Sequence, residues 1–170
     1  MKVFKNRFEA AKLLSLELNQ FRNKKDVIII GIPKGGVPIA FELSKELNLP
    51  FDIFITKKIP IPGNENIAMG AVASGGIIVL NENLILGLKI PESVINQAIE
   101  KVKQEVHNTE SYYRNNQSVP EMAGKTVILV DDGLSTGATI NATIDALKKL
   151  NPHFLIVAVP VAGELVCKEI

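Results

Sequence analysis

The 170-residue sequence is poor in the residues that form disulfide frameworks and metal centres. It contains one cysteine, Cys167, which excludes an internal disulfide framework and a metal site of several cysteines. Its two histidines, His107 and His153, lie far apart in the sequence, and neither has a second histidine nearby with which to form a metal-binding pair. We expect His107 to be solvated on a helix face.

Long apolar runs and a large charge of one sign are also absent. The longest apolar runs, such as residues 27–32, have the length of a strand and fall far short of a membrane span. The N-terminal segment lacks the apolar core of a signal peptide, so the expected location is cytoplasmic. A net charge of +1 gives no electrostatic reason to expect nucleic acid or an anionic membrane as a partner. Nothing in the composition argues against a homodimer.

Helical and strand patterns alternate along the chain. This alternation predicts an α/β fold, with a mostly parallel twisted sheet, helices on both faces and a small hairpin region. We expect strands at 27–30, 51–56, 127–130 and 154–159, and helices at 7–21, 37–47, 92–113 and 138–150. Segments 69–74 and 77–80 are typical of a hairpin, because Gly75-Gly76 supplies two positive-φ positions. Residues 1–170 are predicted to form a single domain.

Apolar residues at helical spacing indicate which helix faces are buried. The first helix, over 7–21, is predicted from the helical spacing of Phe8, Ala11, Leu14, Leu18 and Phe21. The long helix is expected to bury Ile95, Ile99, Val102 and Val106.

Residues 127–139 carry the strongest chemical signal. An apolar strand ends in two adjacent carboxylates, Asp131 and Asp132, and a loop of small residues then leads into a helix. Such a loop exposes backbone N–H groups, and the helix dipole points at the same place, which suits a phosphate. Two acids beside a phosphate would be repulsive unless they bind sugar hydroxyls or a divalent cation. We interpret the loop as a site for a phosphorylated sugar; the structural alternative, an Asp N-cap at a tight turn, needs only one acid.

This order of residues resembles the 5-phosphoribosyl-1-diphosphate (PRPP) signature of type I phosphoribosyltransferases. It is neither a Walker loop nor a dinucleotide fingerprint, because Gly-Lys-Ser/Thr and G-x-G-x-x-G are both missing. The resemblance implies that Asp131 and Asp132 are the catalytic acids, which hold the ribose hydroxyls and help to organise Mg²⁺, directly or indirectly. It implies that the 5-phosphate is bound by Gly133, Leu134, Ser135, Thr136, Gly137, Ala138 and Thr139.

A second loop with phosphate-binding character follows the first strand. Its glycines, Gly35 and Gly36, allow close backbone approach, and Lys34 supplies a cation at the end of a buried strand. The alternative is a glycine turn with a solvated lysine. In the family that the signature resembles, the loop at this position holds pyrophosphate, often through a strained or cis peptide. The resemblance therefore assigns pyrophosphate binding to Pro33, Lys34, Gly35 and Gly36.

A third basic element follows the second strand. Lys57 and Lys58 precede a stretch, residues 59–66, whose proline, glycine and asparagine content predicts a mobile loop. The resemblance implies that the lysine pair contacts the diphosphate and that the loop closes over the reacting sugar. Solvated lysines at a strand end are the alternative.

The resemblance extends over nearly the whole chain, to about Val161-Ala162, and points to a subgroup of predicted bacterial and archaeal phosphoribosyltransferases. Members of that subgroup carry a further C-terminal segment, which would help to cover the base site. The implied activity is Mg²⁺-dependent phosphoribosyl transfer from PRPP to a nitrogen acceptor such as a nucleobase, as in nucleotide salvage. A non-catalytic PRPP or nucleotide sensor is the alternative, since one fold serves several functions.

Overall fold

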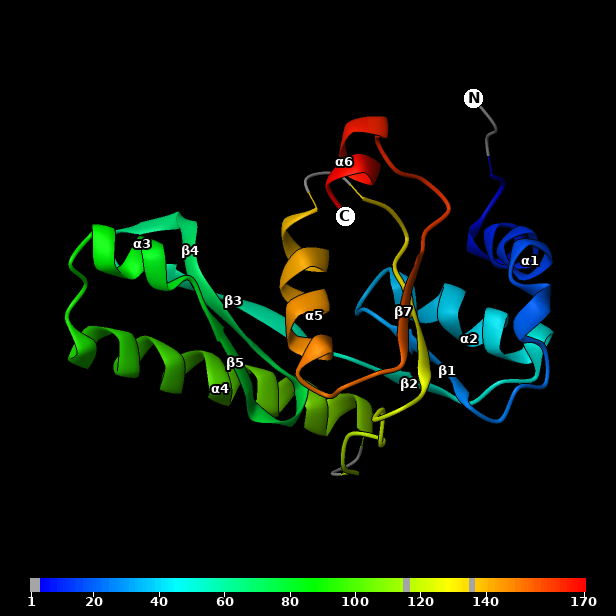
Figure 1. Ribbon diagram of the computed structural model, residues 1–170, viewed down its shortest axis with the longest axis horizontal. Helices are drawn as coiled ribbons and strands as arrows, with labels where there is room; N and C mark the ends of the chain where they lie inside the picture. Colours follow the sequence, from blue (N-terminus) through cyan, green and yellow to red (C-terminus); the bar gives the residue numbers. More distant parts are fainter. Residues whose placement is uncertain (1–3, 115–116, 135–136) are drawn as a thin grey trace. The chain divides into compact units, whose positions relative to one another are not determined.

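The computed structural model describes residues 4–114, 117–134 and 137–170 (Figure 1). The chain divides into two compact units. Unit 1 comprises Met1–Phe54, Pro120–Gly137 and Leu150–Ile170, and unit 2 comprises Ile55–Val119 and Ala138–Lys149. Both units are α/β, so the predicted fold class is confirmed.

Unit 1 is built on a parallel sheet with the strand order β2-β1-β6-β7. Its strands are β1 (Val27–Gly31), β2 (Phe51–Ile53), β6 (Thr126–Val130) and β7 (Phe154–Ala158), and its helices are α1 (Arg7–Glu17), η1 (Asn19–Phe21), α2 (Gly36–Leu47) and α6 (Glu164–Glu169). Every residue of β1 and β6 is buried. Continuous apolar runs such as these are typical of central parallel strands that are covered on both faces.

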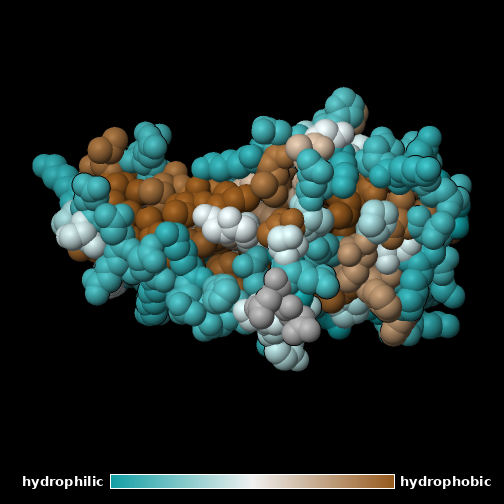
Figure 2. Space-filling model, turned by 90° about the horizontal axis from the view of Figure 1, so that it is seen from below, coloured by the Kyte–Doolittle hydropathy of each residue, from teal (hydrophilic) through white to brown (hydrophobic). Residues whose placement is uncertain are grey.

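Unit 2 is built on an antiparallel sheet with the order β3-β4-β5. It contains β3 (Thr56–Ile61), β4 (Asn64–Ala73), η2 (Ser74–Gly76), β5 (Ile77–Leu80), α3 (Glu82–Gly87), α4 (Glu92–Arg114) and α5 (Ala138–Lys148). The predicted hairpin is confirmed: Gly75 and Gly76 turn between β4 and β5 with φ values of 73° and 75°. Figure 2 shows apolar residues, in brown, reaching the surface of unit 2 between its polar residues.

Helix α4 packs on the sheet of unit 2 through the predicted apolar stripe. All four residues of that stripe are buried: Ile95, Ile99, Val102 and Val106. The opposite side of α4 is polar, and among the described residues no helix is both long and apolar enough to cross a membrane.

Three predicted elements differ in the structure. The first helix, predicted over 7–21, ends at Glu17, and Phe8 in its first turn is 57% exposed. The predicted strand 51–56 is divided, because β2 pairs in the parallel sheet of unit 1 and β3 in the antiparallel sheet of unit 2. Residues 59–66, predicted as a loop, belong to the β3–β4 hairpin, where register shifts beside Pro60 accommodate the missing N–H on an edge strand.

Gly70 tests the packing of unit 2. It pairs with both neighbouring strands, and an added Cβ would overlap the carbonyl oxygen of Val79 and lie 3.1 Å from the Cα of Leu80. We expect Gly70→Ala to lower the free energy of unfolding by about 1–3 kcal/mol, as overpacking does. Chemical denaturation measures this change. Gly87→Ala is the matched control, because a Cβ there meets nothing within 4 Å; equal stability of the two variants would contradict the packing.

Candidate functional site

The carboxyl ends of β1 and β6 bring two of the predicted loops together in unit 1. The two strands are parallel neighbours, paired from Val27↔Thr126 to Gly31↔Val130. Just beyond them, the N–H of Ile32 donates to the carbonyl oxygen of Val130 at 2.9 Å. A Cβ on Gly36 would overlap that same oxygen and lie 2.8 Å from the Cα of Asp131. The close approach of the two backbones therefore requires glycine at position 36.

Asp132 lies directly over the backbone of the loop that follows β1. A Cβ on Gly35 would overlap the carboxyl group of Asp132. Gly35 has ordinary helical dihedrals, φ −68° and ψ −38°, so its backbone conformation does not require glycine. The carboxylate alone excludes a side chain. The peptide bond between Pro33 and Lys34 is cis, and Lys34 is exposed.

Asp131 is a partly buried carboxyl group whose pKa is raised by its surroundings. Burial is the main cause that raises its pKa above the ordinary value of 3.8, and the charge of Asp132 raises it further. The N–H of Asp132 donates to Asp131 Oδ1 at 2.8 Å, which opposes the rise without cancelling it. An acid held at a cost in this way is typical of a ligand-binding site.

Asp132 forms an ion pair with a residue from the far end of the chain. Arg7 Nη2 donates to Asp132 Oδ2 at 2.6 Å. The arginine is fixed by the start of α1, where Asn6 Oδ1 accepts from the N–H of Glu9 at 3.0 Å and Glu9 Oε2 accepts from the N–H of Lys5 at 2.5 Å. This arrangement resembles a capping box, with the glutamate reaching the residue before the N-cap, and it sets the position of Arg7 as the first helical residue.

A cavity of about 820 Å³ in unit 1 opens beside this ion pair. Its walls come from the N-terminal segment, α1, the start of α2 and the segments that follow β6 and β7. The lining residues include Phe4, Lys5, Arg7, Phe8, Asp132 and Pro160. It is lined mainly by apolar side chains and adjoins the acid pair.

The remainder of the predicted 5-phosphate loop continues from the acid pair into unit 2. Leu134 donates its N–H to the carbonyl oxygen of Val161 at 2.9 Å and forms a parallel bridge with Ala162. Gly133 is half-buried, Gly137 has a φ of 70°, and Ala138 begins α5, with Thr139 exposed behind it. Ser135 and Thr136 lie outside the described residues.

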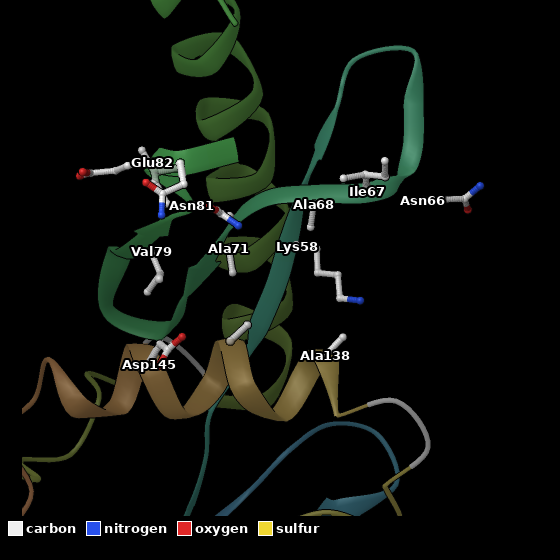
Figure 3. Close-up of a pocket in the computed structure, with 14 residues that line it drawn as sticks. Lys58, Asn66, Ile67, Ala68, Ala71, Val79, Asn81, Glu82, Ala138 and Asp145 are labelled. Carbon is white, nitrogen blue, oxygen red and sulfur yellow. The ribbon is translucent and has the colours of Figure 1, made fainter. Parts of the chain in front are cut away.

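The two predicted lysines point to opposite faces of the sheet in unit 2. Lys57 is paired with Glu105 of α4 at 3.2 Å. Lys58, the next residue of the strand, lines a cavity of about 770 Å³ together with Ala138 of α5. Figure 3 shows the Lys58 side chain extending toward Ala138, with Asp145 near Val79 at the other end of the cavity. Lys58 thus shares this cavity with the start of α5, whereas Lys57 is paired with α4.

The acid pair bears on whether the site could hold a metal ion. Over the described ranges, no group of three or more His, Cys, Asp or Glu side chains is placed to hold one. Asp131 and Asp132 are two carboxylates, which fits Mg²⁺ because that ion keeps several waters and is commonly held by one or two carboxylates plus substrate phosphates. These two residues could therefore hold Mg²⁺ together with a phosphorylated ligand.

Sequence reasoning assigned no role to Arg7, Lys5 or the aromatic residues of the unit 1 cavity. One signal was present: Asn6 followed three residues later by Glu9 predicts a helix start that places Arg7 in the first turn. The partner of Arg7 lies 125 residues away and has no local signal.

Comparisons with known proteins show the family of the chain. A family model described as the phosphoribosyl transferase domain matches residues 4–164. The chain belongs to the phosphoribosyltransferase family. A Mycobacterium tuberculosis protein named "putative phosphoribosyl transferase" is 30% identical over 164 residues, which make up 96% of this chain and 37% of that protein. This family member thus spans little more than a third of its curated relative.

Solved structures share the fold. Protein TT1426 from Thermus thermophilus matches with a TM-score of 0.85 and 28% identity, over 99% of this chain and 79% of the other. A purine phosphoribosyltransferase from Pyrococcus horikoshii matches with a TM-score of 0.54 and 21% identity, over 92% and 74% of the two chains. At 21% identity, the likeness to the Pyrococcus horikoshii protein shows a shared fold and says nothing about the substrate of the present chain.

The raised pKa of Asp131 predicts a stability effect that depends on pH. The folded state holds the proton of Asp131 to higher pH than the unfolded state does, so wild-type stability falls as pH rises from about 3.8 through the folded pKa. Asn at this position can still accept from the N–H of Asp132 and carries no charge. We expect Asp131→Asn to unfold at a higher temperature than wild type at pH 7, with the difference vanishing below pH 3.8. A difference that is independent of pH would contradict this account.

Proposed function

We propose that this chain transfers a phosphoribosyl group from PRPP to a nitrogen acceptor, such as a nucleobase, and releases pyrophosphate. One observation carries the proposal: Asp131 and Asp132 pack against the loop that contains Gly35 and Gly36, at the point where β1 and β6 end. Ligands of open α/β sheets bind outside the carboxyl ends of the strands. A carboxylate pair beside a glycine loop that carries the exposed Lys34 is suited to a ligand with hydroxyls at one point and phosphate at another.

Every predicted site residue except Lys57, which is paired with Glu105, has a role in this proposal. Asp131 and Asp132 accept hydrogen bonds from the ribose hydroxyls. The backbone of residues 133–139 holds the 5-phosphate, and the loop of residues 33–36 holds the diphosphate with the Lys34 ammonium. Lys58, through the cavity it shares with Ala138, contributes a cation near the start of α5.

The proposed reaction exchanges one bond at C1 of the ribose. The bond from C1 to the diphosphate oxygen breaks, and the diphosphate leaves with the bonding electrons. The acceptor nitrogen supplies an electron pair to form the new C1–N bond, and a proton on that nitrogen passes to solvent. Positioning of the reactants and stabilisation of separated charge account for catalysis. Mg²⁺, when bound, would neutralise charge on the departing group. Nucleotide salvage in the cytoplasm is the setting that we propose.

The acid pair supplies the first test. Calorimetric titration with PRPP and Mg²⁺ should show saturable binding by wild type. We expect the Asp131→Asn, Asp132→Asn variant to bind about 100-fold more weakly or not at all, because two charge-assisted hydrogen bonds are lost. Asp26→Asn, at an exposed site of the same unit, is the control and should bind normally. Unchanged affinity in the folded double variant would refute the assignment of these acids.

The two lysines supply a matched pair of variants. Lys58→Met removes the cation that shares a cavity with α5, and we expect it to weaken PRPP binding about tenfold, the worth of one charged contact. Lys57→Met removes only the exposed pair with Glu105, so it should leave PRPP affinity unchanged and lower the free energy of unfolding by less than about 1 kcal/mol. The reverse order of effects on PRPP affinity would show that Lys57, and not Lys58, meets the ligand.

A further inference from the structure

We propose that the 820 Å³ cavity of unit 1 is the acceptor site and that it selects flat aromatic acceptors carrying an anionic group. This inference rests on the proposed function, in which Asp132 binds the ribose. Because Asp132 also lines the cavity, a ligand there would lie next to the sugar. The inference adds the position of the acceptor and its chemical class.

The cavity walls suit a flat ring. Phe4 and Phe8 come from the N-terminal segment and the start of α1, Pro38 from the start of α2 and Pro160 from the segment after β7. Aromatic and proline side chains present broad apolar faces, on which a planar heterocycle can stack. Phe8 is 57% exposed and lies outside the main apolar core, so core packing does not explain its position. A ring in the cavity would cover it.

The charges on the cavity walls favour an anion. The charged residues that line it are Lys5, Arg7 and Asp132. Asp132 is already paired with Arg7 at 2.6 Å, and the Lys5 ammonium has no hydrogen bond or ion pair with any described residue. Within the part of the chain that the structure describes, one positive charge of the cavity lining is therefore uncompensated. A carboxylate on the acceptor ring would complement it.

The position of Arg7 is not explained by the stability of α1. A cation in the first turn opposes the helix dipole, and the N-terminus of α1 is already capped by Asn6 and Glu9. What Arg7 does contact is Asp132. Arg7 and Asp132 thus line the cavity as an ion pair, in which Arg7 can hold the ribose-binding acid in place.

The reaction with such an acceptor balances without a further reactant. A ring nitrogen gives its electron pair to C1 of the ribose to form the C1–N bond, and the diphosphate leaves with the electrons of the broken C1–O bond. Where the ring nitrogen carries a proton, that proton passes to solvent. The carboxylate of the acceptor stays ionised throughout, so no proton transfer to it is required. Lys5 binds the acceptor and does not take part in bond making.

Two pairs of probes separate charge from ring shape. Nicotinate and nicotinamide share a ring and differ in carboxylate against amide, and orotate differs from uracil by one carboxylate. Binding of each is measured by calorimetry with and without PRPP and Mg²⁺, and pyrophosphate release is measured separately. We expect the better carboxylate probe to bind about tenfold more tightly than its neutral partner, the worth of one charge-assisted hydrogen bond.

Lys5→Met and Lys12→Met test the residue itself. Lys12 is exposed on α1 and does not line the cavity, so its variant loses the same charge from the same region. Lys5→Met should abolish the preference for the carboxylate while leaving PRPP affinity intact, and Lys12→Met should retain the preference. Equal binding of charged and neutral probes, no binding of any probe, or a preference that survives in Lys5→Met would overturn the inference. A different result would refute the proposed function itself: a folded wild-type protein that does not bind PRPP.

Discussion

The backbone after β1 lies so close to the end of β6 that Gly36 cannot carry a side chain without meeting the carbonyl oxygen of Val130. At Gly35 the obstacle is the carboxyl group of Asp132, which a side chain would have to displace. The pairing of β1 with β6 fixes this approach, since the register runs without a break from Val27 to Gly31. The acids that follow β6 and the glycine loop that follows β1 thereby meet at one edge of the sheet. Every role assigned in unit 1 depends on that juxtaposition.

The same edge concentrates charge that is costly to hold. Burial raises the pKa of Asp131, and the neighbouring Asp132 adds to the cost. Arg7 compensates Asp132 alone, across an exposed ion pair that contributes little stability by itself. Proteins commonly keep such arrangements where a ligand supplies the missing partners. Sugar hydroxyls, and Mg²⁺ bound with a diphosphate, are partners of the required chemistry.

The sequence predicts the elements whose patterns are local. The apolar runs of β1 and β6, the stripe Ile95, Ile99, Val102 and Val106 on α4, and the turn at Gly75-Gly76 are all as predicted. The division of residues 51–56 between two sheets depends on pairing partners that no local pattern specifies. The contact of Arg7 with Asp132 likewise joins residues 125 positions apart. The acid pair could be predicted from the sequence, because packing alone does not require two adjacent acids after an apolar strand.

Whether the protein transfers a phosphoribosyl group is tested by measuring pyrophosphate release together with formation of a phosphoribosyl product. Wild type would be incubated with PRPP, Mg²⁺ and a panel of nitrogen acceptors, with pyrophosphate quantified and products identified by mass spectrometry. We expect equal amounts of pyrophosphate and of one product that is heavier than its acceptor by a phosphoribosyl group. Saturable binding of PRPP with no pyrophosphate released by any acceptor would contradict transfer and favour a PRPP sensor.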